Sequence, residues 1–131
     1  MSQRISIKCD ECNYEFLLSA AEIKQAGVVI NDQQFDLIYF VCPKCNKIYR
    51  ISINDARYYE LKDDLDKIQK RIQNNIGRMD EDFARTLNNM RLIKFNRLKE
   101  YSMRLNNKFS GTFTFMASEN NQEEQIIKYL P

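Results

Sequence analysis

The stretches CDECN at residues 9–13 and CPKCN at residues 42–46 contain all four cysteines of this 131-residue chain. Two cysteines separated by two residues can bind one metal ion together, and two such pairs complete a tetrahedral shell of four thiolates. A closed shell of this kind leaves no position for water or substrate, so it stabilises a fold rather than performing catalysis. We therefore expect one structural metal ion on four ligands: Cys9, Cys12, Cys42 and Cys45.

The expected compartment favours a metal over a disulfide. The first residues, MSQRIS, lack the apolar segment of a signal peptide, and no apolar run approaches the length of a membrane span. We therefore expect a cytoplasmic protein without a membrane partner. In a reducing cytoplasm, paired C-x-x-C motifs are typical of metal sites. Zinc is the favoured ion, with iron and a disulfide or redox role as the alternatives.

Short β-prone stretches enter and leave each cysteine pair. They alternate apolar and polar residues and are predicted to be strands: residues 4–8, 14–18, 34–41 and 48–53. Ser19-Ala20-Ala21-Glu22 has the pattern of a helix capping box and predicts a short helix that ends at Gly27. Val28-Val29-Ile30 is again β-prone, and Asn31-Asp32 predicts a turn.

The order strand, cysteine knuckle, strand, found twice over residues 4–53, resembles the zinc-ribbon proteins. The resemblance implies one structural Zn²⁺ on the four cysteines. Zinc-ribbon knuckles usually carry glycine after the second cysteine, where the backbone has a positive φ. Asn13 and Asn46 stand there in this chain, and asparagine tolerates that conformation next best. Rubredoxins are similar in knuckle spacing, but they carry glycines and tryptophan where this chain has asparagine and no tryptophan.

Residues 55–109 are predicted to be helical, because they contain no proline and one glycine. Asn54 is a plausible N-cap, with Asp55 in the first turn. Large apolar residues recur at helical spacing, provided that Lys94 fills one position of the stripe. The stripe consists of Leu61, Leu65, Ile68, Ile72, Ile76, Met79, Phe83, Leu87, Met90, Leu98, Tyr101, Leu105 and Phe109.

Two arrangements of this region compete. One is a single long helix from about residue 55 to residue 108, whose exposed stripe requires a coiled-coil partner or a second copy of the chain. The other is a helical hairpin that turns near Gly77, with Asp80 as the N-cap of its second helix. The stripe stays in phase across Gly77, which favours the long helix. The fold class is α+β in either case: a small zinc-ribbon domain at residues 1–54, then the helical region at 55–109.

The second part of the helical region is basic. Residues 83–108 contain seven Lys or Arg and one Asp or Glu. Such a face can bind phosphates or an acidic protein, with Tyr101 available for stacking, although charge runs are more often the solvated side of a helix. The candidate partner-binding residues are Arg91, Lys94, Arg97, Tyr101, Arg104 and Lys108.

The remaining residues, 110–131, form a C-terminal tail in this reading. Residues 112–116 alternate as a short strand, and residues 118–125 are polar and predict a loop. Residues 126–130 form an apolar end that is either a docking segment or a short helix. We expect the tail to interact, because Phe109, Phe113 and Phe115 are unfavourable in water, and its strand can pair with a sheet edge of this chain or of a partner.

Nothing in the sequence indicates catalysis. The chain has no histidine, which removes the commonest general base, and it contains no phosphate-binding glycine loop or nucleophile motif. We therefore expect a protein that is not an enzyme.

The layout resembles small cytoplasmic proteins encoded by phages and other mobile elements of Gram-positive bacteria. In those proteins a ribbon with the pattern C-x-x-C…C-P-x-C precedes a charged coiled coil. The resemblance implies an accessory or regulatory role. Our leading hypothesis is an interaction protein that associates through residues 55–108 and binds a macromolecular partner, such as a protein of a host machine. The alternative is a nucleic-acid-binding regulator that uses residues 91–108.

Overall fold

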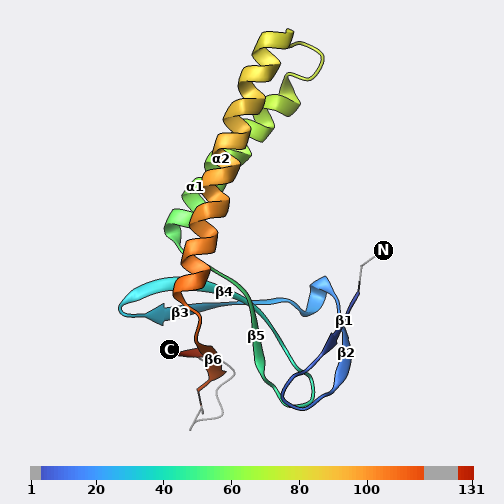
Figure 1. Ribbon diagram of the computed structural model, residues 1–131, viewed down its shortest axis with the longest axis vertical. Coiled ribbons are helices and arrows are strands. Elements are labelled where there is room, and N and C mark those ends of the chain that lie inside the picture. The colour runs from blue at the N-terminus through green and yellow to red at the C-terminus, as the bar shows by residue number, and fades with distance from the viewer. Residues whose placement is uncertain (1–3, 117–126) are drawn as a thin grey trace. The chain divides into compact units, whose positions relative to one another are not determined.

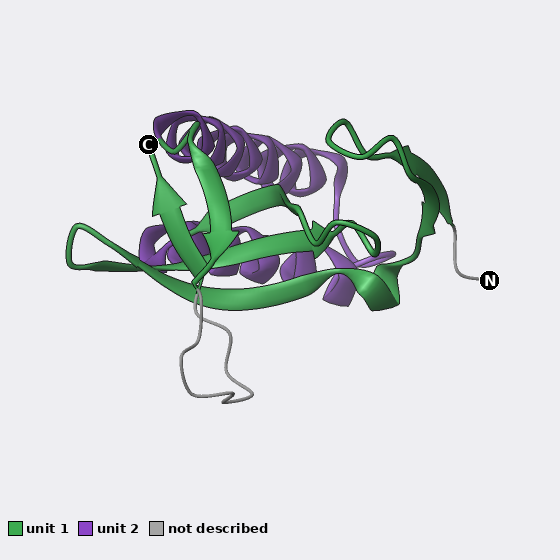
Figure 2. Ribbon diagram, turned by 90° about the horizontal axis from the view of Figure 1, so that it is seen from below, with its two compact units in different colours: residues 1–54, 109–131 green, residues 55–108 purple. Residues whose placement is uncertain are grey.

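A computed structural model describes residues 4–116 and 127–131 of the chain. The elements follow in the order β1–β5, α1, α2, β6 and β7, with one short 3₁₀ turn after β2 (Figure 1). The chain forms two compact units (Figure 2). The first unit comprises residues 1–54 and 109–131, and the second comprises residues 55–108. The fold is α+β, and the helical unit is inserted in the sequence between β5 and β6.

The strands expected beside the cysteine pairs are confirmed. β1 (Ile5–Lys8) and β2 (Glu15–Leu18) form an antiparallel hairpin over the first pair. β3 (Lys24–Ile30), β4 (Gln33–Val41) and β5 (Ile48–Asn54) form an antiparallel sheet in that order. The turn between β3 and β4 is the one expected, since Asn31 and Asp32 have φ angles of 51° and 64°. Two positive φ angles match the right-handed twist of a tight hairpin.

The helix predicted from Ser19 to Gly27 is wrong. Only Ala20–Glu22 is helical, as a 3₁₀ turn, and the side chain of Ser19 makes no capping hydrogen bond. Gly27 lies inside β3, where it pairs with Asp36 of β4. Pairing with β4 buries Val28 and Ile30, and this tertiary gain outweighs a local capping preference.

The C-terminal tail belongs to the first unit. β6 (Thr112–Phe115), predicted as a strand, pairs antiparallel with β7 (Ile127–Leu130). The short helix considered for residues 126–130 is therefore wrong, and the loop predicted for residues 118–125 lies outside the described residues. A side chain at Gly111 would collide with the backbone, because its Cβ would lie 2.1 Å from the carbonyl oxygen of Leu130.

Aromatic side chains of the C-terminal tail pack on side chains of β4. Phe109 meets Phe35 of β4 at a ring-centroid distance of 4.9 Å, and Tyr129 of β7 lies 5.6 Å from Phe109. Phe115 packs on Tyr39 at 6.5 Å, and Phe113 is buried. The phenylalanines that we expected to interact are therefore packed within the first unit of their own chain.

The second unit is a helical hairpin, so the long continuous helix is wrong. α1 (Ala56–Asn74) and α2 (Glu81–Lys108) pack against each other and bury Leu61, Leu65, Ile68, Leu87 and Leu105 (Figure 1). Intramolecular packing covers the stripe without the loss of freedom that association of two chains requires. The hairpin thus buries part of the stripe that suggested a coiled coil, while Ile76 and Phe83 stay exposed.

The turn between the helices uses the signals that the sequence offered. Gly77 has a φ of 82°, and the Asp80 side chain accepts a hydrogen bond from the N–H of Phe83 at 2.7 Å. Arg71 of α1 lies over the Phe83 ring at 5.6 Å, which links the two helices beside the turn. Ile76, whose phase favoured the continuous helix, is 70% exposed, so its place in the stripe was coincidental.

The opposite end of the hairpin is closed by Asp55. Asp55 is the N-cap of α1, one residue later than expected, and it accepts a hydrogen bond from the N–H of Tyr58 at 2.8 Å. Its second carboxylate oxygen accepts a hydrogen bond from the Tyr101 hydroxyl of α2 at 2.5 Å. One carboxylate therefore caps the first helix and binds the second.

Candidate metal centre

The four cysteine sulfurs converge in the first unit. All four Sγ atoms lie within 4.8 Å of one another, although the two pairs are far apart in the sequence. The sulfurs of Cys9 and Cys45 are 3.6 Å apart, as are those of Cys12 and Cys42. Each of these contacts joins one pair to the other, so the first hairpin is attached to the end of the sheet through this cluster.

The two knuckles have the same backbone geometry. The N–H of Asn13 donates to the carbonyl of Cys9 at 2.9 Å, and the N–H of Asn46 donates to the carbonyl of Cys42 at 2.9 Å. Asn13 and Asn46 have φ angles of 61° and 64°. The expectation that asparagine replaces the usual glycine in a left-handed conformation is confirmed at both positions.

The sulfur positions fit a metal ion. A tetrahedral ion with metal–sulfur bonds of about 2.3 Å separates its ligands by roughly 3.8 Å, close to the shortest sulfur–sulfur distances in the cluster. A disulfide bond is only about 2.05 Å long, and all four cysteines are free. These cysteines could therefore hold one metal ion, with every ligand supplied by the protein.

The thiols differ in their readiness to ionise. A hydrogen bond from Tyr49 lowers the pKa of the Cys9 thiol to about 6 against the opposing effect of burial, and the N–H groups of Cys12 and Glu11 assist. Burial also opposes ionisation of Cys42, but the N–H groups of Cys45 and Lys44 lower its pKa. The N–H of Lys47 favours the Cys45 thiolate, yet burial and the neighbouring sulfurs raise the Cys45 pKa to about 12.

Crowding explains this division. Four thiolates within a few ångströms repel one another, so some thiols keep their protons unless a cation is present. A bound divalent ion removes that repulsion and releases the remaining protons. Metal affinity should therefore fall as the pH falls, because protons compete for the same sulfurs.

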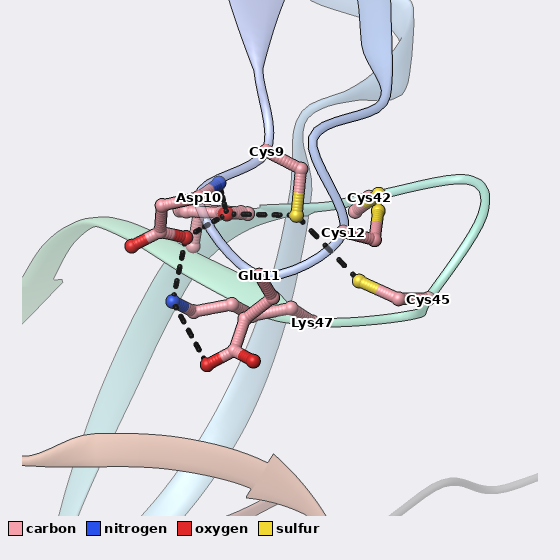
Figure 3. A network of polar contacts seen from close by, with 8 residues as sticks. Cys9, Asp10, Glu11, Cys12, Cys42, Cys45 and Lys47 are labelled. Carbon is pink, nitrogen blue, oxygen red and sulfur yellow. Dashed lines mark hydrogen bonds and ion pairs between the residues drawn. The ribbon is translucent and has the colours of Figure 1, made fainter.

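A group of polar side chains surrounds Cys9 (Figure 3). The Tyr49 hydroxyl lies 3.1 Å from Cys9 Sγ and 2.5 Å from Asp10 Oδ1. Lys47 Nζ binds the same Asp10 oxygen at 2.8 Å, and this contact is the main reason that the pKa of Asp10 is lowered. Reasoning from the sequence did not identify this group. The available signal was a tyrosine four residues after Cys45, at the position that Phe16 occupies after Cys12.

The predicted partner-binding residues of α2 lie in the second unit, away from the cysteine cluster in the sequence and in a different unit. Lys94 and Arg97 line a small cavity with Leu61 and Asp64 of α1. The Tyr101 ring is half-buried and its hydroxyl binds Asp55, as described above. Lys94 and Tyr101 are thus half-buried between the helices, whereas Arg97 is exposed at the rim of the cavity.

The other members of that set are placed differently. Arg91 donates to the side chain of Asn88 at 3.0 Å, and Arg104 pairs loosely with Glu100 at 3.7 Å. Lys108 is the last residue of α2 and is exposed. The members of the set therefore differ in their contacts: Lys94 and Tyr101 are half-buried beside α1, whereas Arg104 and Lys108 are exposed.

Comparison with known proteins found no matching family model, no matching curated protein and no matching solved structure. The resemblance to phage-encoded proteins therefore rests only on the order of the cysteine pairs and the helical region. Among the described residues, no helix combines the length and apolar character that crossing a bilayer requires. The four-cysteine cluster of this chain is consistent with a zinc ribbon.

Proposed function

We propose that this protein is a non-enzymatic interaction protein with a structural zinc ion on its four cysteines and a protein-binding surface on α2. A four-thiolate shell suits Zn²⁺, whose preferred geometry is tetrahedral, and has no open position for chemistry. Such an ion would join the β1–β2 hairpin to the β4–β5 end of the sheet, because each strand pair supplies two of the four cysteines. The function then depends on what the rest of the surface binds.

The observation that carries the binding proposal is an exposed apolar surface on α2. Four large side chains within twelve residues are 42–56% exposed, and we call them the outer strip: Leu92, Ile93, Phe95 and Met103. Helical spacing places Leu92 and Met103 roughly opposite the buried Leu87 and Leu105, and places Phe95 on the flank between the two sides. A solvated helix flank does not require large apolar residues there.

The chemistry of the outer strip indicates the kind of partner. Lys99 lies among these apolar residues by helical spacing, and α2 carries more basic than acidic residues. A second copy of the same basic helix would be repelled, whereas an acidic protein surface with apolar side chains would be attracted. We therefore favour a different, acidic protein as the partner.

The experiment compares a strip variant with a matched control of the same helix. Leu92→Ser/Phe95→Ser/Met103→Ser removes the apolar surface, and Asn89→Ser/Asn96→Ser/Asn107→Ser changes exposed polar residues only. Affinity purification from the cell of origin should recover a partner with the wild type and the control but not with the strip variant. Equal recovery with all three proteins would contradict the proposal, and circular dichroism verifies that the helices are retained.

The alternative function is nucleic-acid binding by the basic residues of α2. Arg97 and Arg104 are exposed and support this alternative, because contacts to phosphate groups require positive charge but no particular fold. Binding that weakens steeply with salt and disappears in Arg97→Glu/Arg104→Glu would favour this function over protein binding. Absence of binding to DNA and RNA at physiological salt would eliminate it.

A further inference from the structure

The two cysteine knuckles have the same spacing and the same backbone hydrogen bonds. They differ in the aromatic residue that follows each of them. The fourth residue after Cys12 is Phe16, and the fourth residue after Cys45 is Tyr49. Both rings lie against Phe40, at centroid distances of 6.3 Å and 5.1 Å. The two positions therefore differ mainly by the hydroxyl group of Tyr49.

That hydroxyl contacts several neighbouring groups. The backbone N–H of Asp10 donates to the Tyr49 oxygen at 3.1 Å, and the Asp10 carboxylate lies 2.5 Å from it. Lys47 fixes this carboxylate at 2.8 Å and also lies over the Tyr49 ring at 5.0 Å. The single hydroxyl proton of Tyr49 is shared between two acceptors, Cys9 Sγ at 3.1 Å and the Asp10 carboxylate.

Cys9 and Cys42 form a natural matched pair for testing what the hydroxyl does. Each is the first cysteine of its knuckle, and both have 0% exposure. Each knuckle is also closed by the same backbone hydrogen bond, from the N–H of Asn13 to the carbonyl of Cys9 and from the N–H of Asn46 to the carbonyl of Cys42. Within the described part of the chain, the hydroxyl hydrogen bond to a cysteine sulfur is made to Cys9 and not to Cys42.

We propose that Tyr49 is a positioning residue of the metal centre, which retains Cys9 on the ion so that the second knuckle releases the ion first. This inference rests on the proposed metal site. A hydrogen bond donated to a metal-bound thiolate withdraws charge from the sulfur and orients it, so the thiolate attacks electrophiles more slowly. Cys45, the exposed member of the cluster, then becomes the sulfur that detaches most readily.

Alkylation of the zinc-loaded full chain tests the proposal directly. Each thiolate attacks the methylene carbon of iodoacetamide, forming a carbon–sulfur bond as iodide leaves, and peptide mass spectrometry identifies the labelled sulfur. In the wild type, Cys45 should react first, and Cys42 should react roughly tenfold faster than Cys9, since loss of outer-shell contacts typically changes metal sites by 10–100-fold. In Tyr49→Phe, Cys9 and Cys42 should react at similar rates.

A second measurement and two controls separate the hydroxyl effect from general loosening. Transfer of zinc to a coloured chelator should be several-fold faster in Tyr49→Phe than in the wild type. Tyr14→Phe removes the hydroxyl of the first knuckle's exposed tyrosine and should leave both measurements unchanged. Asp10→Asn removes the carboxylate that competes with Cys9 for the Tyr49 proton, so it should slow the alkylation of Cys9 relative to the wild type.

The outcomes distinguish this inference from the metal site itself. If Tyr49→Phe leaves the Cys42-to-Cys9 rate ratio unchanged, or if Tyr14→Phe changes it equally, Tyr49 has no positioning role. If the wild type takes up no metal, the proposed zinc centre fails first. A protein that binds zinc normally but shows no asymmetry between Cys9 and Cys42 overturns only the inference.

Discussion

The cysteine knuckles and the helical hairpin place their defining residues by opposite means. In each knuckle, two ligands and a left-handed asparagine lie within five residues, and the local backbone hydrogen bonds are the same in both copies. In the hairpin, Leu65 and Leu87 are buried only because two helices fold back on each other. The first is specified by spacing, and the second by packing.

This difference teaches where sequence patterns are reliable. A metal shell requires a particular number of ligands at particular distances, so few alternatives satisfy it. An apolar stripe requires only that something cover it, and another helix of the same chain or a second chain can do so. The following experiments test whether the two regions are as independent as this contrast implies.

Removing the metal should have the largest effect and should fall on the first unit. Structural zinc ions contribute on the order of 10 kcal/mol to the folding of small domains. We expect Cys9→Ser/Cys42→Ser to abolish metal binding and to disorder the β1–β2 hairpin, while the helical signal in circular dichroism is largely retained. Metal analysis and NMR spectra measure the two effects, and loss of the helices as well would show that the units depend on each other.

Truncating the hairpin core should have the next largest effect and should spare the knuckles. Leu87 is 1% exposed, and a buried leucine replaced by alanine typically costs about 3 kcal/mol. Leu87→Ala should therefore lower the denaturant midpoint of the helical signal. Leu92→Ala, in the outer strip, should change stability by no more than about 0.5 kcal/mol. Altered metal binding in Leu87→Ala would contradict the proposed separation.

Replacing each of two glycines by alanine tests the turn between α1 and α2. Gly77 has a φ of 82°, and alanine in that conformation costs roughly 1–2 kcal/mol. Gly77→Ala should destabilise the hairpin by this amount in thermal unfolding followed by circular dichroism. Gly27 lies in a strand, where a Cβ would meet its nearest neighbour at 3.7 Å, so Gly27→Ala should be tolerated. Equal effects of both changes would argue against the observed turn.

The smallest expected effect concerns the contact between Tyr101 and Asp55. Burial, and then the hydrogen bond to Asp55, raise the pKa of Tyr101 to about 12 from an ordinary value of 10.0. A raised pKa means that the contact stabilises the hairpin fully below about pH 10 and is lost as the pH rises through 12.

Tyr101→Phe should therefore cost about 1 kcal/mol at neutral pH and less at high pH. Denaturation at pH 8 and at pH 11.5 measures the difference, and a cost that did not decrease with pH would exclude this contact as the source. The chosen pH values lie on either side of the range in which the free tyrosine ionises.

The first unit shows how far local sequence patterns reach. The strands beside the cysteines, the turn at Asn31 and Asp32, and the left-handed Asn13 and Asn46 are all as expected. The prediction failed between Ser19 and Gly27, where a capping pattern indicated a helix and the chain forms a strand. The competing force was pairing with β4, a partner that no local pattern reveals.

The second unit shows where local sequence patterns are insufficient. Gly77 and Asp80 were recognised as turn signals, but an apolar residue at position 76 favoured continuity, and that residue is exposed. Leu92, Ile93 and Phe95 are not members of the apolar stripe, and only burial in the folded hairpin shows that they stay exposed.

By itself, the sequence determined the four-sulfur cluster, the strands that present it and the helical character of residues 56–108, because each depends on spacing along the chain. Only the tertiary structure decided that the helices fold back, that the C-terminal strands cover the sheet, and that Tyr49 reaches Cys9. These contacts join residues distant in sequence, and their formation depends on which apolar surfaces can be buried together. Spacing specifies what a segment can do locally, and packing selects among the possibilities.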